Sequence, residues 1–385
     1  MSEWKNATIG DLCDTISDTY RGKDDKVVLV NTSDVLNGKV LNHELVPNKN
    51  LKGQFKKTFR KDDILYSEIR PANKRFAYID FEDTAHYIAS TKLMVLRPRA
   101  DKVEPRYLFN LLTSPDMLAK MQHLAETRSG TFPQITFSSE LAPSPVLLPD
   151  KESQKKIVSF IDAIGGKIDE NERINKNLQE QAQTLYTNMF IHNASVQWGE
   201  GALSDVADIT MGQSPKGDTY NEDGIGTVFF QGRGEFGFRF PTRRLFTTDP
   251  KRMAQSNDVL MSVRAPVGDL NVAYEPCCIG RGLGAIRSKD NHQSFVLYTV
   301  FSLREKLDMF NGEGTVFGSI NRDALNSMPI IIPTKGEMDR FEEIVAPMDA
   351  AIRNNYEEIC RLEAIRDSLL PRLMSGELDV SNLDL

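Results

Sequence analysis

Three glycines form the one spacing in this sequence that is typical of cofactor chemistry. Gly232, Gly234 and Gly237 match the pattern G-x-G-x-x-G, with which dinucleotide-binding proteins bring backbone N–H groups against a pyrophosphate. That chemistry requires the glycines to lie between a strand and a helix, but here Phe238 and the residues up to Pro241 do not open a helix. We therefore interpret this segment as a turn-rich loop.

Other catalytic patterns are absent from the sequence or poorly placed. It contains no G-x-x-x-x-G-K-[ST] loop for ATP, no H-E-x-x-H zinc motif and no Pro-Pro pair of the kind found in amino-methyltransferases. Asp150, Glu152 and Lys155 loosely resemble a metal-dependent nuclease motif, but they begin a predicted helix and their spacing is too short. The histidines are far apart: His43, His86, His123, His192 and His292. The sequence predicts a non-catalytic protein without cofactor or metal.

Charge is distributed unevenly along the chain. The formal net charge is −7, yet residues 49–75 contain 9 basic and 3 acidic side chains, and residues 233–252 contain 6 and 2. Residues 335–385 contain 6 basic and 12 acidic side chains, which accounts for most of the acidic excess. Since the local field decides where a polyanion docks, the two basic clusters are compatible with nucleic acid. Ordinary solvated surface is the alternative reading of each cluster.

The chain is a tandem duplication. Trp4, Ile9 and Asp11 recur as Trp198, Leu203 and Asp205 at a constant shift of 194 residues. Residues 63–67 recur as 258–262, and 145–149 recur as 329–333, at shifts of 195 and 184. The change in shift predicts that the framework is duplicated while the intervening segments have diverged.

A long amphipathic helix is predicted at the end of each half. Apolar residues recur there at alternating steps of four and three, the 3.5-residue period of a coiled coil. Amphipathic helices packed on separate cores are the alternative. Gly165, Gly166 and Pro347 predict a bend or a late helix start, and Pro371 predicts a kink. The predicted seam comprises Ile157, Ile161, Ile164, Ile168, Asn171, Leu178, Leu185, Val345, Met348, Ile352, Asn355, Ile359, Leu362 and Leu369.

The remaining segments favour mixed domains. Short β-branched or aromatic runs at residues 27–30, 87–96 and 227–231 predict strands, and the spacing at 107–123 and 295–309 predicts helices. The expected fold class is α+β, with two mixed α/β domains in a pseudo-twofold tandem repeat, separated by two long helices that form an antiparallel coiled coil. The domains are expected at residues 1–150 and 195–334, and the helices at 151–194 and 335–385.

The composition favours a cytoplasmic protein. No stretch approaches the roughly 20 apolar residues that cross a bilayer, and the N-terminus has no secretory signal pattern. Cys13, Cys277, Cys278 and Cys360 are too few and too scattered for a disulfide framework or a zinc site. We therefore expect a reducing compartment and no membrane.

The duplicated order of these motifs resembles the specificity (S) subunit of Type I restriction–modification systems over nearly the whole length. Residues 209–220, with Gly212, Ser214 and Pro215, look like that family's domain opening, and residues 257–264 look like its central strand. Residues 329–333 are similar to its entry into the long helix. The first half lacks the Gly-Gln-Ser-Pro opening, so no DNA sequence can be transferred from the family.

The resemblance implies a non-catalytic subunit that binds a bipartite, asymmetric site in double-stranded DNA. It further implies two modification (methyltransferase) subunits and motor-nuclease restriction subunits as partners. The glycine-containing loops at 128–131 and 312–315 are expected near the DNA, because small residues permit close backbone approach. The candidate DNA-binding residues are Lys23, Arg70, Lys74, Arg75, Lys216, Arg233, Arg239, Arg243, Arg244 and Arg264.

Other functions stay open on the sequence alone. A stand-alone nuclease or methyltransferase would bind a divalent metal or S-adenosylmethionine by itself. A coiled-coil DNA-binding regulator would have no adjacent methyltransferase gene. The specificity module of a Type IIB-like or methylation-only system would look nearly identical in sequence.

Overall fold

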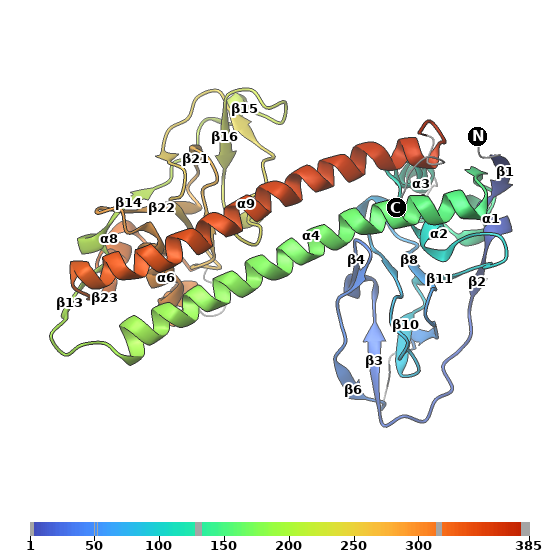
Figure 1. The fold of residues 1–385 in the computed structure, drawn as a ribbon, viewed down its shortest axis with the longest axis horizontal. Helices are drawn as coiled ribbons and strands as arrows, with labels where there is room; N and C mark the ends of the chain where they lie inside the picture. The colour runs from blue at the N-terminus through green and yellow to red at the C-terminus, as the bar shows by residue number, and fades with distance from the viewer. Residues whose placement is uncertain (1–3, 50, 52, 128–132, 313–317, 379–385) are drawn as a thin grey trace. The chain divides into compact units, whose positions relative to one another are not determined.

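The computed structural model describes residues 4–49, 51, 53–127, 133–312 and 318–378 (Figure 1). The chain divides into two compact units. Unit 1 consists of residues 1–170 and 358–385, and unit 2 consists of residues 171–357. Each unit therefore contains one recognition-like segment and a part of both long helices.

Unit 1 is built on two four-stranded sheets. In the antiparallel sheet the order is β2 (Cys13–Ile16), β11 (Leu93–Pro98), β8 (Ile64–Ser67), β9 (Phe76–Tyr78). In the mixed sheet the order is β6 (Leu45–Pro47), β3 (Lys26–Val30), β10 (Tyr87–Ser90), β7 (Phe55–Lys57), with β3 and β10 parallel. Two short pairs complete the strands, β1 (Lys5–Thr8) with β12 (Pro145–Leu148) and β4 (Val35–Leu36) with β5 (Lys39–Val40).

Alternation along β8 divides the core of unit 1. Ile64 and Tyr66 pack in one cluster with the helices, whereas Leu65 packs in a second cluster with Val28 and Val30 of β3. This follows from the period of two, by which successive strand side chains point to opposite faces. The helices of unit 1 are α1 (Ile9–Leu12), α2 (Pro105–Leu112) and α3 (Pro115–Thr127).

Unit 2 repeats this plan with a five-stranded second sheet. The antiparallel order is β14 (Ala207–Met211), β22 (Leu283–Ser288), β19 (Val259–Ser262), β20 (Leu270–Val272). The other order is β15 (Tyr220–Asn221), β17 (Phe246–Thr247), β16 (Thr227–Phe230), β21 (Cys277–Ile279), β18 (Met253–Ala254), with β16 and β21 parallel. β13 (Gly199–Ala202) pairs with β23 (Pro329–Ile332), and the helices are α5 (Leu203–Val206), α6 (Gln293–Ser302), α7 (Arg304–Asp308) and α8 (Arg322–Asn326).

The duplicated aspartates make duplicated contacts. The carboxylate of Asp63 accepts from Nε and Nη2 of Arg97 at 2.8 and 2.7 Å, and that of Asp258 accepts from the same atoms of Arg287 at 2.7 and 2.9 Å. Each aspartate precedes the central strand of its sheet, and each arginine lies on the neighbouring strand. The sequence repeat therefore corresponds to a repeat of structure.

The long helices α4 (Lys151–Tyr186) and α9 (Lys335–Met374) run side by side and antiparallel within each unit (Figure 1). In unit 2 the ring centroids of Tyr186 and Phe341 lie 5.8 Å apart, and Asn175 meets Asn355 further along both helices. In unit 1, Ile157 and Ile161 of α4 share a core with Leu373 of α9. Every predicted seam residue is buried or half-buried.

Neither long helix is interrupted at its glycines or prolines. α4 continues through Gly165 and Gly166, and α9 begins at Lys335, well before Pro347. The expectation of a late helix start is therefore wrong. Pro347 is exposed, so water can satisfy the backbone carbonyl that loses its N–H partner, while Val345 and Ile352 on either side are buried.

The strands and helices predicted from short runs of sequence are present, but three of them are divided into two elements. The strand expected at residues 87–96 is two strands, β10 and β11, and the helix expected at 107–123 is two helices, α2 and α3. Likewise α6 and α7 replace the single helix expected at 295–309. The strands at 27–30 and 227–231 are present as β3 and β16.

Candidate nucleic-acid interface

Four loops meet at one edge of the sheets in unit 2. We call residues 212–216, 231–233, 263–266 and 280–282 the unit 2 loop cluster; they follow β14, β16, β19 and β21. Backbone N–H groups of Gln213 and Gly280 donate to the carbonyls of Ile279 and Phe230 at 2.9 and 2.8 Å. Gly282 donates to Gln231 at 3.1 Å, so the loops are tied to one another.

Glycine makes the close approach of these loops possible. A Cβ atom on Gly212 would lie 2.1 Å from the backbone oxygen of Gly280, and one on Gly282 would lie 2.7 Å from that of Gln231. Both distances are shorter than van der Waals contact, so any larger residue would push the loops apart. The loops that carry the side chains are therefore held close together.

The unit 2 loop cluster presents hydrogen-bond donors without carboxylates. Its four segments contain no Asp or Glu. Arg and Lys can donate to guanine O6 and N7 and to phosphate, and Gln can pair with adenine N6 and N7. The exposed polar and basic side chains are those of Gln213, Lys216, Gln231, Arg233, Arg264 and Arg281.

Three of the predicted DNA-binding residues, Lys216, Arg233 and Arg264, lie in this cluster. Arg264 is exposed, and its backbone forms an isolated bridge with that of Ser319. Lys216 is exposed at the start of a short 3-10 turn. Arg233 is half exposed and forms an ion pair with Asp269.

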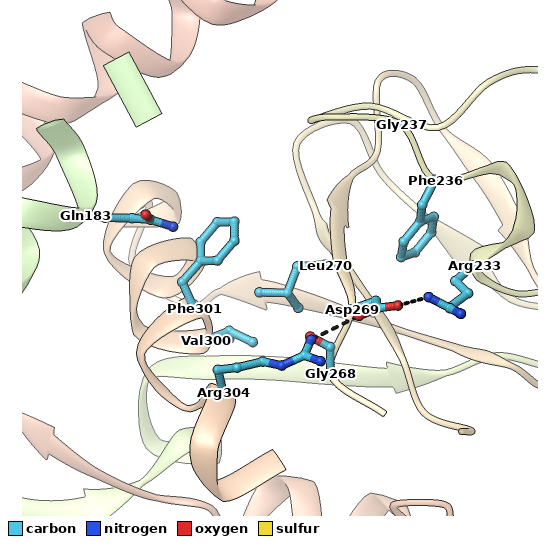
Figure 2. A pocket seen from close by; sticks show the side chains of 10 residues that line it. All are labelled: Gln183, Arg233, Phe236, Gly237, Gly268, Asp269, Leu270, Val300, Phe301 and Arg304. Carbon is cyan, nitrogen blue, oxygen red and sulfur yellow. Dashed lines mark hydrogen bonds and ion pairs between the residues drawn. The ribbon is translucent and has the colours of Figure 1, made fainter. Parts of the chain in front are cut away.

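A cavity of about 520 Å³ lies beside Arg233 (Figure 2). Asp269 lies between two arginines there, Arg233 and Arg304, and Nη1 of Arg304 donates to Oδ1 of Asp269 at 2.9 Å. Phe236 and Phe301 also line the cavity. The carboxylate of Asp269 holds the Arg233 guanidinium in a fixed direction. Nε of Arg304 also lies 3.1 Å from Oδ1 of Asp308, so two carboxylates face the two arginines.

The other predicted arginines of unit 2 lie in different surroundings. Arg243 pairs with Glu275, and Nη2 of Arg244 lies 2.7 Å from Oε1 of Glu235; both arginines are more than half exposed. Arg239 is 4% exposed, and its guanidinium is occupied inside the unit. Its stretch of sequence looked like a solvated basic cluster, but Arg239 points inward, so we leave it out of the DNA-contacting set.

Unit 1 has loops in equivalent positions, residues 68–75, 91–92 and 133–134, which we call the unit 1 loop cluster. The N–H of Glu68 donates to Lys92 at 3.2 Å, just as Val263 donates to Gly282 at 2.9 Å in unit 2. The N–H of Arg70 donates to Pro133 at 3.1 Å. Arg70 and Lys74 are exposed and have left-handed backbones, with φ of 46° and 53°, on either side of the 3-10 turn Pro71–Asn73.

The side chains of two further predicted residues of unit 1 differ in their surroundings. Nη1 of Arg75 donates to the carbonyl of Ser33 at 3.0 Å, so this side chain braces the loops against each other. Lys23 is exposed in the loop between β2 and β3. The loops expected near DNA at 128–131, and all of 312–315 except Gly312, lie outside the described residues.

Several exposed side chains of the loop clusters were missed by the sequence reasoning. Arg281 stands alone between Gly280 and Gly282, and its N–H donates to Oγ of Ser214 at 3.2 Å. A search for basic clusters passes over a single arginine, but an arginine flanked by glycines is a usable signal. The other missed residues are Gln213 and Gln231 in unit 2 and Lys92 and Gln134 in unit 1.

Burial shifts the pKa of several ionisable groups among the described residues. Burial raises the pKa of the Cys13 and Cys277 thiols to about 12, which disfavours the nucleophilic thiolate. Burial also lowers the pKa of Lys57, whose Nζ donates to the carbonyls of Thr91 and Leu93 at 3.1 and 2.7 Å and so supports the unit 1 loops. Within the described ranges, no three His, Cys, Asp or Glu side chains are grouped to hold a metal ion.

The long helices are amphipathic and carry many charges. In the part of the chain that the structure covers, no helix has a stretch that is both long enough and apolar enough to cross a membrane.

Comparison with known proteins places this geometry in a family. The model of the Type I restriction modification DNA specificity domain matches residues 1–180 and again residues 195–364. The Type I restriction enzyme HindI specificity subunit of Haemophilus influenzae is 30% identical over an alignment of 464 residues that covers 98% of this chain and all of that protein. The putative Type I restriction enzyme MjaX specificity subunit of Methanocaldococcus jannaschii is 30% identical and covers 83% of this chain and 79% of its own.

A solved structure has the same fold. The crystal structure of the Type I restriction–modification system S subunit from M. genitalium matches with a TM-score of 0.57 at 14% identity, covering 97% of this chain and 96% of that one. The two family matches fall on the two halves of the duplication. The chain belongs to the family of Type I restriction–modification DNA specificity subunits.

Proposed function

We propose that this chain is the DNA sequence-specificity subunit of a Type I restriction–modification complex and that it binds a bipartite, asymmetric DNA site. The duplicated fold, with a loop cluster at the same sheet edge in each unit, is the observation that carries the proposal. Two similar but diverged loop clusters suit two different half-sites. The family matches do not favour a stand-alone enzyme or a coiled-coil regulator.

We divide the loop residues by the kind of DNA contact they would make. Contacts to phosphates supply affinity without sequence information, and contacts to base edges in the major groove supply discrimination. Lys216 and Lys74, which are flexible point charges, suit phosphates. Arg264 and Arg281 in unit 2 and Arg70 in unit 1 have the planar donors that pair with guanine.

The partners we propose are two modification subunits and, through the assembled complex, restriction subunits. A pseudo-twofold repeat offers each surface twice, which supports two copies of one partner. The catalysis would belong to these partners. All four cysteines are free thiols, which supports a reducing compartment such as the cytoplasm.

The domain limits follow the same proposal. Residues 1–150 and 195–334 would form the two target-recognition domains, and residues 151–194 and 335–385 would contain the helices that connect them. Because α4 and α9 each pass through both units, the helices would set the spacing of the half-sites.

Methylome sequencing tests the function. Cells expressing the chain with its modification subunit are expected to methylate one bipartite motif. The double variant Arg264→Ala with Arg281→Ala should relax one half of that motif, and Arg70→Ala should relax the other half. Methylation or cleavage by the isolated chain would contradict the proposal, and so would loss of both halves from either variant.

A further inference from the structure

One face of α9 holds the recognition segment of unit 2 through charged and aromatic side chains. We call Asp339, Glu342, Asp349, Arg353 and Glu357 the docking face. Their spacing of three, seven, four and four residues places them on one side of the helix. The seam residues Val345, Ile352 and Asn355 lie on a neighbouring side.

The central contact of the docking face is made by Arg239. Its Nη1 donates to Oδ1 of Asp349 at 3.0 Å, and its Nη2 donates to the hydroxyl of Tyr298 in α6 at 3.1 Å. The Tyr298 hydroxyl in turn donates to Oδ1 of Asp349 at 2.9 Å. A loop, α6 and α9 are thus joined by one largely buried network, which restricts how the loop can move against the helix.

A second contact lies one helical turn further along. Nη2 of Arg353 donates to the carbonyl of Tyr274 at 2.6 Å, and Nη1 donates to Oδ1 of Asn257 at 3.0 Å. The guanidinium lies 4.3 Å from the centroid of the Tyr274 ring, and the Tyr274 hydroxyl donates to Oε1 of Glu357 at 2.9 Å. Arg353 therefore clamps the turns that flank β19 and β20, the strands next to the loop cluster.

The amino-terminal part of the docking face engages the start of α6. Glu342 accepts from the N–H groups of Ser294 and Phe295 at 3.1 and 3.2 Å, and Nε2 of His292 lies 2.7 Å from Oδ1 of Asp339. These acidic residues of α9 therefore make hydrogen bonds and ion pairs that hold the recognition segment against the helix.

Unit 1 uses the same kind of joint with other residues. Nε of Arg106 in α2 lies 3.2 Å from Oδ1 of Asp162 in α4, and its guanidinium lies 4.8 Å from the centroid of the Tyr78 ring. Oε1 of Gln154 in α4 accepts from the N–H of Glu104, the residue before α2, at 2.8 Å. Each recognition segment is therefore fixed to one long helix by an arginine, a tyrosine and a helix carboxylate.

We infer that Arg239, Asp349 and Arg353 are positioning residues that set the allowed half-site spacing. None of the three belongs to the residues that we assign to DNA contact. They fix the direction of the loop cluster relative to α9, a helix that continues into unit 1. A loosened joint would let the loops reach a half-site displaced by one base pair, about 3.4 Å along the duplex.

Methylome sequencing of Arg353→Met, with the proposed modification subunit present, tests the inference, which rests on the proposed function. Methionine keeps the apolar stem and removes the clamp. Methylation at sites whose spacer differs by one base pair should rise about tenfold over wild type, as a restraint weakened by roughly 1.4 kcal/mol implies. The sequences of both half-sites should stay unchanged.

Two further variants keep the test sharp if Arg353→Met folds poorly. Tyr274→Phe removes only the hydroxyl that donates a hydrogen bond to Glu357. Thermal unfolding of the full chain establishes that each variant is folded. Arg340→Met is the matched control, because Arg340 is an exposed arginine of α9 with no ion pair to the residues described. It should methylate the wild-type motif only.

The outcomes separate the two proposals. A wild-type protein that directs no bipartite methylation would overturn the proposed function. Suppose instead that the wild-type protein directs methylation of one motif. The positioning role would then be overturned if the folded variants methylate only the wild-type spacer length, or if they lose base preference within a half-site.

Discussion

Nδ2 of Asn355 in α9 donates a hydrogen bond to Oδ1 of Asn175 in α4 at 2.8 Å. Asn175 is 3% exposed, so the pair is a polar contact inside a largely apolar seam that also contains Asn171. The duplication relates Asn355 to Asn171, yet its partner is Asn175, one turn further along the helix. In an antiparallel pair such a contact favours one register, because a shift by one turn would separate Asn355 from Asn175.

Removing one amide is expected to cost more than removing both. Asn355→Leu leaves Asn175 buried without this partner and should lower the free energy of unfolding by about 1–3 kcal/mol. Asn175→Leu with Asn355→Leu should restore or exceed the wild-type stability, since no buried amide is then left without its partner. Urea unfolding of the full chain measures both. Equal stability of the single and the double variant would show that the pair is not coupled.

Arg281 is expected to act on discrimination. In the complete complex, Arg281→Ala should reduce the preference for the cognate duplex over one changed at a single G·C pair by about 1–3 kcal/mol, roughly 5-fold to 150-fold. Competition binding at a fixed salt concentration gives this ratio. A variant that loses affinity equally for both duplexes would make Arg281 a phosphate contact.

Lys216 is expected to contribute to affinity and not to discrimination between sequences. Lys216→Ala should weaken binding to all sequences by a similar factor and reduce the slope of log K against log salt by about 1. Binding isotherms at several salt concentrations give the slope. An unchanged slope would place Lys216 away from the DNA backbone.

Periodic features of the fold were predictable from the sequence, and long-range partners were not. The seam follows from the steps of three and four between Ile157 and Ile168, a local pattern. The role of Arg239 depends on Asp349, which lies 110 residues away, and on Tyr298, so a count of basic residues assigns it to the surface. Similarly, Arg281 joins Arg264 only because β19 and β22 pair in register.

At Pro347, the packing of neighbouring side chains outweighs the low helix propensity of proline. Pro347 costs an isolated helix about 3 kcal/mol relative to alanine, but Phe341 and Val345 before it and Ile352 after it are fully buried. Burial of these side chains favours one continuous helix from Lys335. The sequence shows the proline, whereas the packing that outweighs it becomes visible only with the partner elements in place.

The duplicated ion pairs are expected to stabilise their own sheets. The carboxylate of Asp258 is 5% exposed and that of Asp63 is 1% exposed, whereas the arginines are partly hydrated. Asp258→Asn and Asp63→Asn should each lower the free energy of unfolding by about 1–3 kcal/mol. Thermal unfolding measures the loss. Asp290→Asn, an exposed carboxylate of unit 2, is the control and should change stability little.

Glu342 should make the stability of unit 2 depend on pH. Burial raises the pKa of this carboxyl above its ordinary value of 4.5, while the N–H groups of Ser294 and Phe295 and the nearby His292 oppose the rise. Between the ordinary and the raised pKa, the folded protein retains a proton that the unfolded chain has released. The stability contributed by this group is therefore full below pH 4.5 and is lost as the pH rises through the folded pKa.

Glu342→Gln removes this titration. The difference in unfolding free energy between Glu342→Gln and wild type should shift in favour of the variant as the pH rises from 4.5 to 7, because only the wild type must ionise a buried carboxyl. Urea unfolding at a series of pH values measures the difference, and Glu343→Gln, an exposed neighbour, should show no such trend. A difference that moves toward the wild type with rising pH would mean that the N–H groups at the start of α6 stabilise the carboxylate more than burial destabilises it.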